Sequence, residues 1–247
     1  MGFSNPNVRY AWPPLTKGLK ALLITYVVLY IATLFKGSLG FEKIMTSALF
    51  LSWEGMFEHF YLWQPLTYQL LHDDFFHIFF NALVLYSFGG QVEKRWGALP
   101  FVRFVLLCGL GGAAAVLALD AILIALIGSP GASVVGASGG IYGVVTAFSI
   151  YQWEQPVHLM IGKPIKGKWI LPIFLGLDVL FIFLGSPTSL PGHVGGLLMG
   201  AALVTGYYKP QRAIDRFKLW RARRRLKLLR GGHPLDPKDD DKPRYLH

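Results

Sequence analysis

The sequence predicts an all-α polytopic membrane protein. Of its 247 residues, 53% are hydrophobic and only 15% are charged, which is too apolar for an ordinary soluble domain. The basic residues fall between alternate apolar runs, as the positive-inside rule requires of cytoplasmic segments. We therefore expect a bundle of six membrane-spanning helices with both chain termini in the cytoplasm.

The six apolar runs are separated by turn-rich or charged segments. They cover residues 19–35, 66–89, 101–127, 138–154, 169–184 and 193–208. The first run is long for a cleaved signal peptide and has no clear cleavage site, so we interpret it as a retained anchor. The segment between the first two runs is rich in aromatic residues, which is typical of a loop in the outer membrane interface.

The chain divides into four predicted parts. Residues 1–18 form a cytoplasmic segment, 19–208 the six-span domain, 209–230 a basic amphipathic cytoplasmic helix, and 231–247 a disordered polar tail. Of the 24 lysines and arginines, 13 lie between Lys209 and Arg244. This basic helix is expected to bind anionic lipid headgroups of the bilayer, and not nucleic acid. Cys108 has no second cysteine with which to form a disulfide.

Polar residues of three different runs are predicted to lie at one depth. Ser138, His193 and His77 each lie 16 residues from the charged end of their run, which is roughly 24 Å at the rise of an α-helix. Asn81 follows His77 by one turn on the same helix face. Because polar groups inside a membrane are expensive and usually mark function, the shared depth indicates a site.

The residue types at this depth suit acyl transfer. Ser138 is the candidate nucleophile, and His193 is the base that would take its proton. The backbone N–H of Ser138, the Asn81 amide and the His77 imidazole are candidate donors to an oxyanion. Small residues on the fourth and sixth runs would let these helices approach closely: Gly139, Gly143, Gly192, Gly196 and Gly200.

Taken together, these motifs resemble those of the rhomboid intramembrane serine proteases, from about Trp63 to Tyr208. Gly136, Ala137, Ser138 and Gly139 are similar to the family's Gly-x-Ser-Gly. The other matching positions are His72, His77 and Asn81 in the second run, Glu93, Lys94 and Arg95 after it, and His193, Gly196 and Gly200 in the last run.

The resemblance implies a six-helix rhomboid-like bundle whose water-filled cavity opens to the outer side, with the fifth span as a lateral gate. Ser138 and His193 would form a dyad without an acid, His77 and Asn81 would join the oxyanion hole, and Tyr142 would pack against the His193 ring. The implied substrates are single-pass membrane proteins, cut in or near their membrane spans. No cofactor is expected, and no soluble domain is expected ahead of the first span. The simple six-span layout and the short amino-terminal segment favour a bacterial plasma membrane, with an organellar membrane as the alternative.

Several alternatives stay open at this stage. Gln64 replaces an arginine of the family, which puts the rigidity of the first loop in doubt. His72 is interpreted as a hydrogen-bonding residue that supports the second span, and Asp178 as a structural residue that lies deeper than the dyad and is not its acid. The histidines lack the spacing of a metal site. The rival functions are a catalytically silent relative that binds membrane helices and, more distantly, a transporter.

Overall fold

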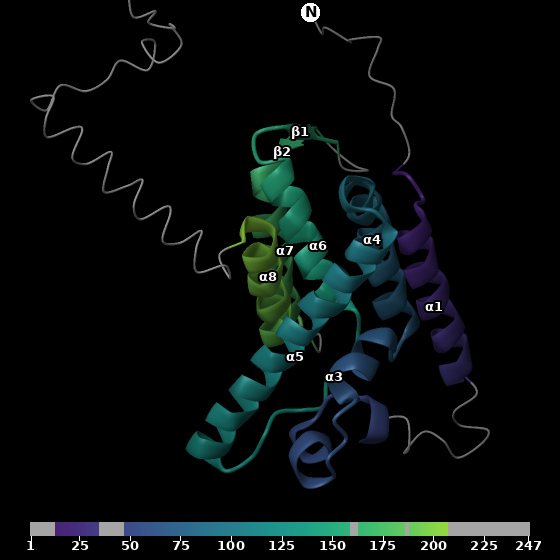
Figure 1. Ribbon diagram of the computed structural model, residues 1–247. Coiled ribbons are helices and arrows are strands. Elements are labelled where there is room, and N and C mark those ends of the chain that lie inside the picture. The colour runs from purple at the N-terminus through teal and green to yellow at the C-terminus, as the bar shows by residue number, and fades with distance from the viewer. Residues whose placement is uncertain (1–12, 35–46, 159–162, 186–187, 207–247) are drawn as a thin grey trace, which may run out of the picture. The chain divides into compact units, whose positions relative to one another are not determined.

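The computed structural model describes residues 13–34, 47–158, 163–185 and 188–206. The helices are α1 (Lys17–Leu34), α3 (Gln64–Thr67), α4 (Phe75–Trp96), α5 (Ala98–Ile127), α6 (Ser138–Tyr151), α7 (Ile170–Phe183) and α8 (Leu190–Thr205). A short antiparallel hairpin, β1 (Pro156–Val157) and β2 (Ile165–Lys166), connects α6 to α7 (Figure 1). The predicted helix at 209–230 and the tail at 231–247 lie outside the described residues.

The protein is mostly helical, and three of its described helices are long and apolar enough to cross a membrane. These are α1, α4 and α5, with 18, 22 and 30 residues. Helix α8 is a shorter apolar helix of 16 residues, and α6 and α7 have 14 residues each. Every predicted run therefore contains a helix, and the polytopic helical prediction is confirmed at this coarser level.

The second predicted run is not one helix, which corrects its expected start. Residues Gln64–Leu70 form two short turns, Leu71 is extended, and α4 begins only at Phe75. The Asp74 carboxylate accepts a hydrogen bond from the His77 backbone N–H at 2.9 Å, which caps the new helix. A hydropathy pattern averaged over a whole span does not detect this boundary, because only three consecutive polar residues, 72–74, interrupt a largely apolar run.

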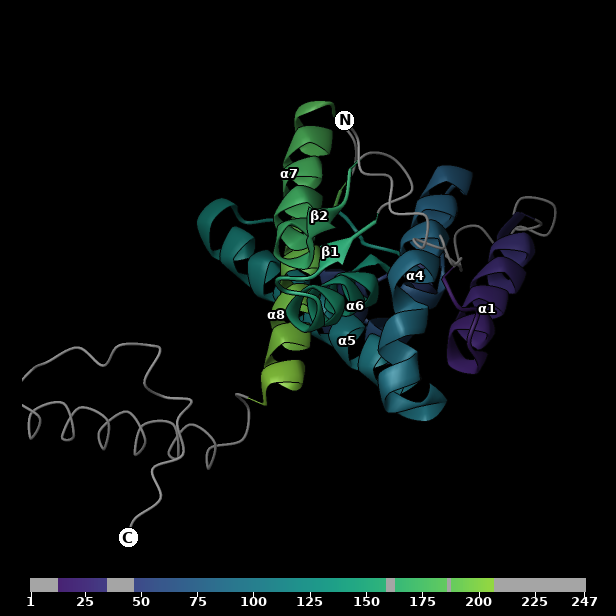
Figure 2. The ribbon, with the colours of Figure 1, turned by 90° about the horizontal axis from the view of Figure 1, so that it is seen from above.

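Helix α6 lies at the centre of the bundle. Every residue from Gly139 to Ser149 is buried. Seen from above, α6 runs between α4, α5 and α8 (Figure 2), and it packs directly on α4 and α5. Phe148 of α6 packs on Phe88 of α4, with ring centroids 4.9 Å apart. The first residue of this buried helix is Ser138, so the bundle holds it in a fixed place.

The Glu93 carboxylate, which is buried inside the protein, caps the first helix. Its oxygens accept hydrogen bonds from the backbone N–H groups of Gly18 and Leu19 at 2.8 and 2.6 Å, and from the Thr16 hydroxyl at 2.5 Å. The first N–H groups of a helix have no partner within the helix, and a carboxylate there also interacts favourably with the helix dipole. This accounts for a buried acid at the end of α4.

Gln64 is fully buried and links two parts of the first loop. Its amide donates to the Ser47 carbonyl at 2.9 Å and accepts from the Ser52 backbone N–H at 3.1 Å. The loop is therefore held by a neutral side chain at the position where the family often has a charge. These two bonds join Gln64 to residues 47 and 52 of the loop.

Candidate active site

The loop before Ser138 brings α6 into contact with α4. Gly136 has a positive φ of 124°, a conformation that side chains other than glycine rarely adopt. Its N–H donates to the Tyr68 carbonyl at 2.9 Å, and a Cβ at this position would overlap Nε2 of His77. The His77 ring therefore lies against the backbone that leads into Ser138. Both the positive φ and the contact with His77 favour glycine at position 136.

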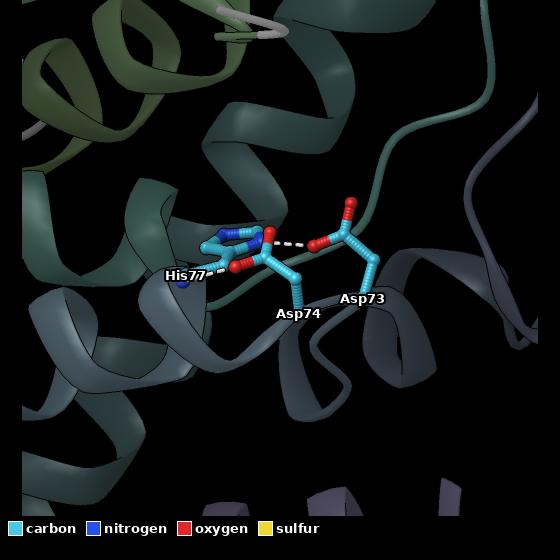
Figure 3. A group of neighbouring side chains, drawn as sticks. All are labelled: Asp73, Asp74 and His77. Atoms are coloured by element: carbon cyan, nitrogen blue, oxygen red, sulfur yellow. Dashed lines mark hydrogen bonds and ion pairs between the residues drawn. The ribbon is translucent and has the colours of Figure 1, made fainter. Parts of the chain in front are cut away.

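The His77 ring is held by an acid on the same chain segment. Its Nδ1 lies 2.5 Å from Oδ1 of Asp73. Figure 3 shows the Asp73 and Asp74 side chains beside His77, with this contact and the helix cap as dashed lines. Contact with His77 is the main reason why the pKa of the Asp73 carboxyl is lowered. This pairing leaves Nε2 of His77 on the side that faces Gly136. Asp73 lies four residues before His77, and the sequence alone does not indicate this contact.

Among the residues described, Asp73, Asp74 and His77 are grouped closely enough to hold a metal ion. Their ligand atoms all lie within 4.8 Å of one another. Hydrogen bonds already account for the arrangement, since Asp73 pairs with the His77 ring and Asp74 caps α4. The cluster is therefore explained as the support of His77.

Asn81 lies one turn after His77 and is buried. Its Nδ2 has no hydrogen-bond partner in the described part of the chain. A buried amide donor without a partner is unfavourable, and such groups usually mark a site completed by a ligand or water. A buried amide donor without a partner suits the role of donating to an oxyanion.

His72 is also buried and unpartnered. Neither ring nitrogen forms a hydrogen bond within the described ranges, so the predicted hydrogen bonds of His72 are wrong. The ring instead packs edge-on against the rings of Tyr26 and His77, with centroids 5.4 and 5.1 Å apart. Burial, which disfavours the charged form, lowers the pKa of His72 to about 3.

His193 is fixed by two contacts. Its ring stacks on the Tyr142 ring, with centroids 4.3 Å apart and planes 14° apart, as expected. Its Nδ1 lies 2.9 Å from Oδ2 of Asp178, and the Tyr142 hydroxyl donates to the same oxygen at 2.5 Å. The expected hydrogen bond of Asp178 is therefore present, and its partner is His193, from which the depth estimate had separated it.

Helices α6 and α8 meet at the residues next to Ser138 and His193. A Cβ at Gly139 would lie 3.2 Å from the Gly192 carbonyl, and a Cβ at Gly196 would overlap the Gly139 carbonyl. The predicted glycine contact is therefore present. Ser138 begins α6 and His193 lies on α8, but no hydrogen bond joins the Ser138 hydroxyl to His193 in the described part of the chain.

One cavity of about 150 Å³ lies between α4 and α6, away from Ser138. Its lining residues are Gln91, Val92, Arg95, Phe148, Tyr151 and Gln152. Phe148 follows Ser138 by ten residues, roughly 15 Å along a helix. This cavity is not the expected water-filled pocket around Ser138, which stays a prediction.

Comparison with known proteins identifies the kind of bundle that these helices form. The model of the rhomboid domain matches residues 59–210. The chain is 28% identical over 184 residues to the rhomboid protease GlpG of Photorhabdus laumondii, covering 72% of this chain and 57% of that protein. It is 32% identical over 138 residues to the rhomboid protease GluP of Bacillus subtilis, covering 56% and 24%.

A third relative is the rhomboid-like protease 3 of Toxoplasma gondii, 26% identical over 154 residues, which cover 62% of this chain and 54% of the relative. The chain thus spans less than two thirds of the length of each of these relatives. The matched domain covers more than half of the chain, and the chain belongs to the rhomboid family. Together with its apolar helices, this makes it an integral membrane protein of polytopic helical fold.

Proposed function

We propose that this chain is an intramembrane serine endopeptidase that cuts single-pass membrane proteins in or near their membrane spans. The observation that carries the proposal is the fixed His193 ring, stacked on Tyr142 and bonded to Asp178, at the helix contact beside Ser138. Membership of a family whose relatives are named as proteases supports the same activity.

In this proposal, Ser138 attacks the carbonyl carbon of the scissile peptide bond while Nε2 of His193 takes the hydroxyl proton. The tetrahedral oxyanion is stabilised by the Ser138 backbone N–H, the Asn81 amide and the His77 ring. Collapse of the intermediate expels the amine, which receives the proton from His193. Water then attacks the acyl-enzyme with His193 again as base, and releases the new carboxylate and Ser138.

A substrate is required to complete the site. Hydrogen bonds between catalytic groups are often long or absent in a free enzyme and form only in the substrate complex. The missing bond between Ser138 and His193 is consistent with this behaviour, because rotation of the Ser138 side chain moves its oxygen while both helices stay in contact. The unpartnered Asn81 donor is likewise free to bind an oxyanion.

The proposal includes the membrane arrangement. Helices α6, α7 and α8 join the three longer helices as six spans within residues 19–208, both chain termini lie in the cytoplasm, and the membrane is a bacterial plasma membrane. The basic residues of segment 209–230 bind anionic lipid headgroups. No metal, cofactor or nucleic acid takes part.

The test is cleavage of a labelled single-span substrate by the purified chain in liposomes. We expect the unmodified protein to cleave it and both Ser138→Ala and His193→Ala to lose activity to background. Cleavage that survives both changes contradicts the assignment of nucleophile and base. Binding of the substrate without cleavage by the unmodified protein favours a catalytically silent relative.

A further inference from the structure

Helix α7 is anchored to the bundle at few positions, and Asp178 is one of them. Only Ile170 and Asp178 are buried in this helix, whereas apolar side chains such as Leu177 and Val179 on either side are exposed. An acid in such an apolar helix is expensive unless it is paired. Its pairing is therefore informative about what the helix does.

The Asp178 carboxylate binds two groups of the candidate site through one oxygen. Oδ2 lies 2.9 Å from Nδ1 of His193 and 2.5 Å from the Tyr142 hydroxyl, and all three residues are buried. Asp178 thus connects α7 to α6 and to α8. Its partner on α8 is the histidine that we propose as the base.

We infer that Asp178 is a positioning residue for His193, so that α7 supplies the acid of a Ser138–His193–Asp178 triad. This inference rests on the proposed function and deepens it. A carboxylate at Nδ1 accepts the Nδ1 proton, which leaves the lone pair of the imidazole on Nε2, where a base needs it. The Tyr142 hydroxyl fixes the same carboxylate oxygen, and its ring fixes the plane of the imidazole.

The triad needs no additional reactant. When Nε2 takes the Ser138 proton, His193 becomes an imidazolium and Asp178 stays ionised beside it. When the amine leaves, the proton passes from Nε2 to the amine nitrogen and His193 is neutral again. Asp178 therefore holds the tautomer and stabilises the charged form without exchanging a proton.

Kinetics of Asp178→Ala and Asp178→Asn test the inference. The alanine variant removes the acceptor, and we expect its kcat to fall at least about 100-fold with KM within about threefold of the unmodified chain. The asparagine variant keeps an oxygen for both donors but loses the charge, and we expect a smaller loss of roughly tenfold or more. A kcat within threefold of the unmodified value in either folded variant overturns the inference.

Two further variants control for the loss of a buried polar group. Asp120 is a buried acid of α5 that accepts only the Gly131 backbone N–H among the described interactions, at 2.9 Å. We expect Asp120→Asn to keep kcat within about twofold. Tyr142→Phe keeps the ring on His193 but removes the hydroxyl, so its loss of kcat should be smaller than that of Asp178→Ala. Equal losses of kcat in Tyr142→Phe and Asp178→Ala contradict the direct action of Asp178 on His193.

A measurement on the unmodified chain covers the case in which Asp178 variants do not fold. In ¹⁵N-histidine NMR at neutral pH, with the His193 signals assigned by their loss in His193→Gln, we expect the proton on Nδ1 and a bare Nε2. A proton on Nε2 overturns the inference. If the unmodified chain has the expected tautomer but cleaves nothing, the proposed protease activity fails and the Asp178–His193 pairing stands.

Discussion

At the scale of single residues, the candidate site contains polar groups that the fold leaves without partners. The Asn81 amide nitrogen is buried and makes no hydrogen bond in the described chain. We expect Asn81→Ala to lower kcat about 10²-fold to 10³-fold, because one oxyanion donor contributes about 2.7–4 kcal/mol in the transition state. The melting temperature should not fall, because no bond of the resting protein is lost. Unchanged turnover in a liposome cleavage assay contradicts the oxyanion role of Asn81.

His72 provides a prediction for stability against pH. Its pKa is about 3 in the folded protein and 6.5 for a free histidine, so between these values the unfolded chain binds a proton that the folded chain does not. Stability contributed by the neutral ring is therefore full above pH 6.5 and is lost as the pH falls. The nearby Asp73, whose free value is 3.8, adds a similar loss only below about pH 4.

Between pH 6.5 and 4, therefore, the stability depends on the titration of His72 and not on that of Asp73. We expect the melting temperature of the unmodified chain in detergent to fall across this window more steeply than that of His72→Phe, which keeps a ring against Tyr26 but cannot titrate. Parallel curves for the two proteins contradict a buried neutral His72.

At the scale of helices, the contact between α6 and α8 requires glycine, which has no side chain, where the two backbones meet. A Cβ at Gly200 would lie 2.7 Å from the Gly143 Cα, and backbone atoms cannot move aside as a flexible side chain can. We expect Gly200→Ala to lower the melting temperature and to destabilise the fold by about 1–3 kcal/mol. Gly176→Ala on α7 is the matched control, because a Cβ there meets nothing within 4 Å. Equal melting temperatures of the two variants contradict the close packing of α6 on α8.

The helices also show which features a sequence pattern can predict. Hydropathy located all six apolar runs, and the four-residue glycine spacing predicted the face on which α6 meets α8. The start of α4 was missed because its signal is short: three polar residues, 72–74, interrupt a largely apolar run, and one of them, Asp74, is the cap. The partner of Asp178 was missed because depth along one helix does not specify how neighbouring helices tilt.

At the scale of the whole molecule, the helical bundle brings the polar groups of the candidate site together inside an apolar protein. A buried central helix carries Ser138, the proposed nucleophile, at its first residue. Three neighbouring helices carry the other proposed groups: His77 and Asn81 on α4, Asp178 on α7 and His193 on α8. In a medium that offers few competing hydrogen bonds, such fixed donors are stronger than they are in water. The residue types were predictable from the sequence, whereas their contacts depend on the bundle.

The central claim is that Ser138 is a nucleophile activated by His193. Its most direct measurement is labelling of the purified, membrane-reconstituted chain with a fluorophosphonate, followed by mass spectrometry of the modified peptide. The account predicts a single adduct on Ser138 that is absent in Ser138→Ala and strongly reduced in His193→Ala. Equal labelling of the His193→Ala protein, or no adduct on Ser138 in a folded unmodified chain, would contradict it.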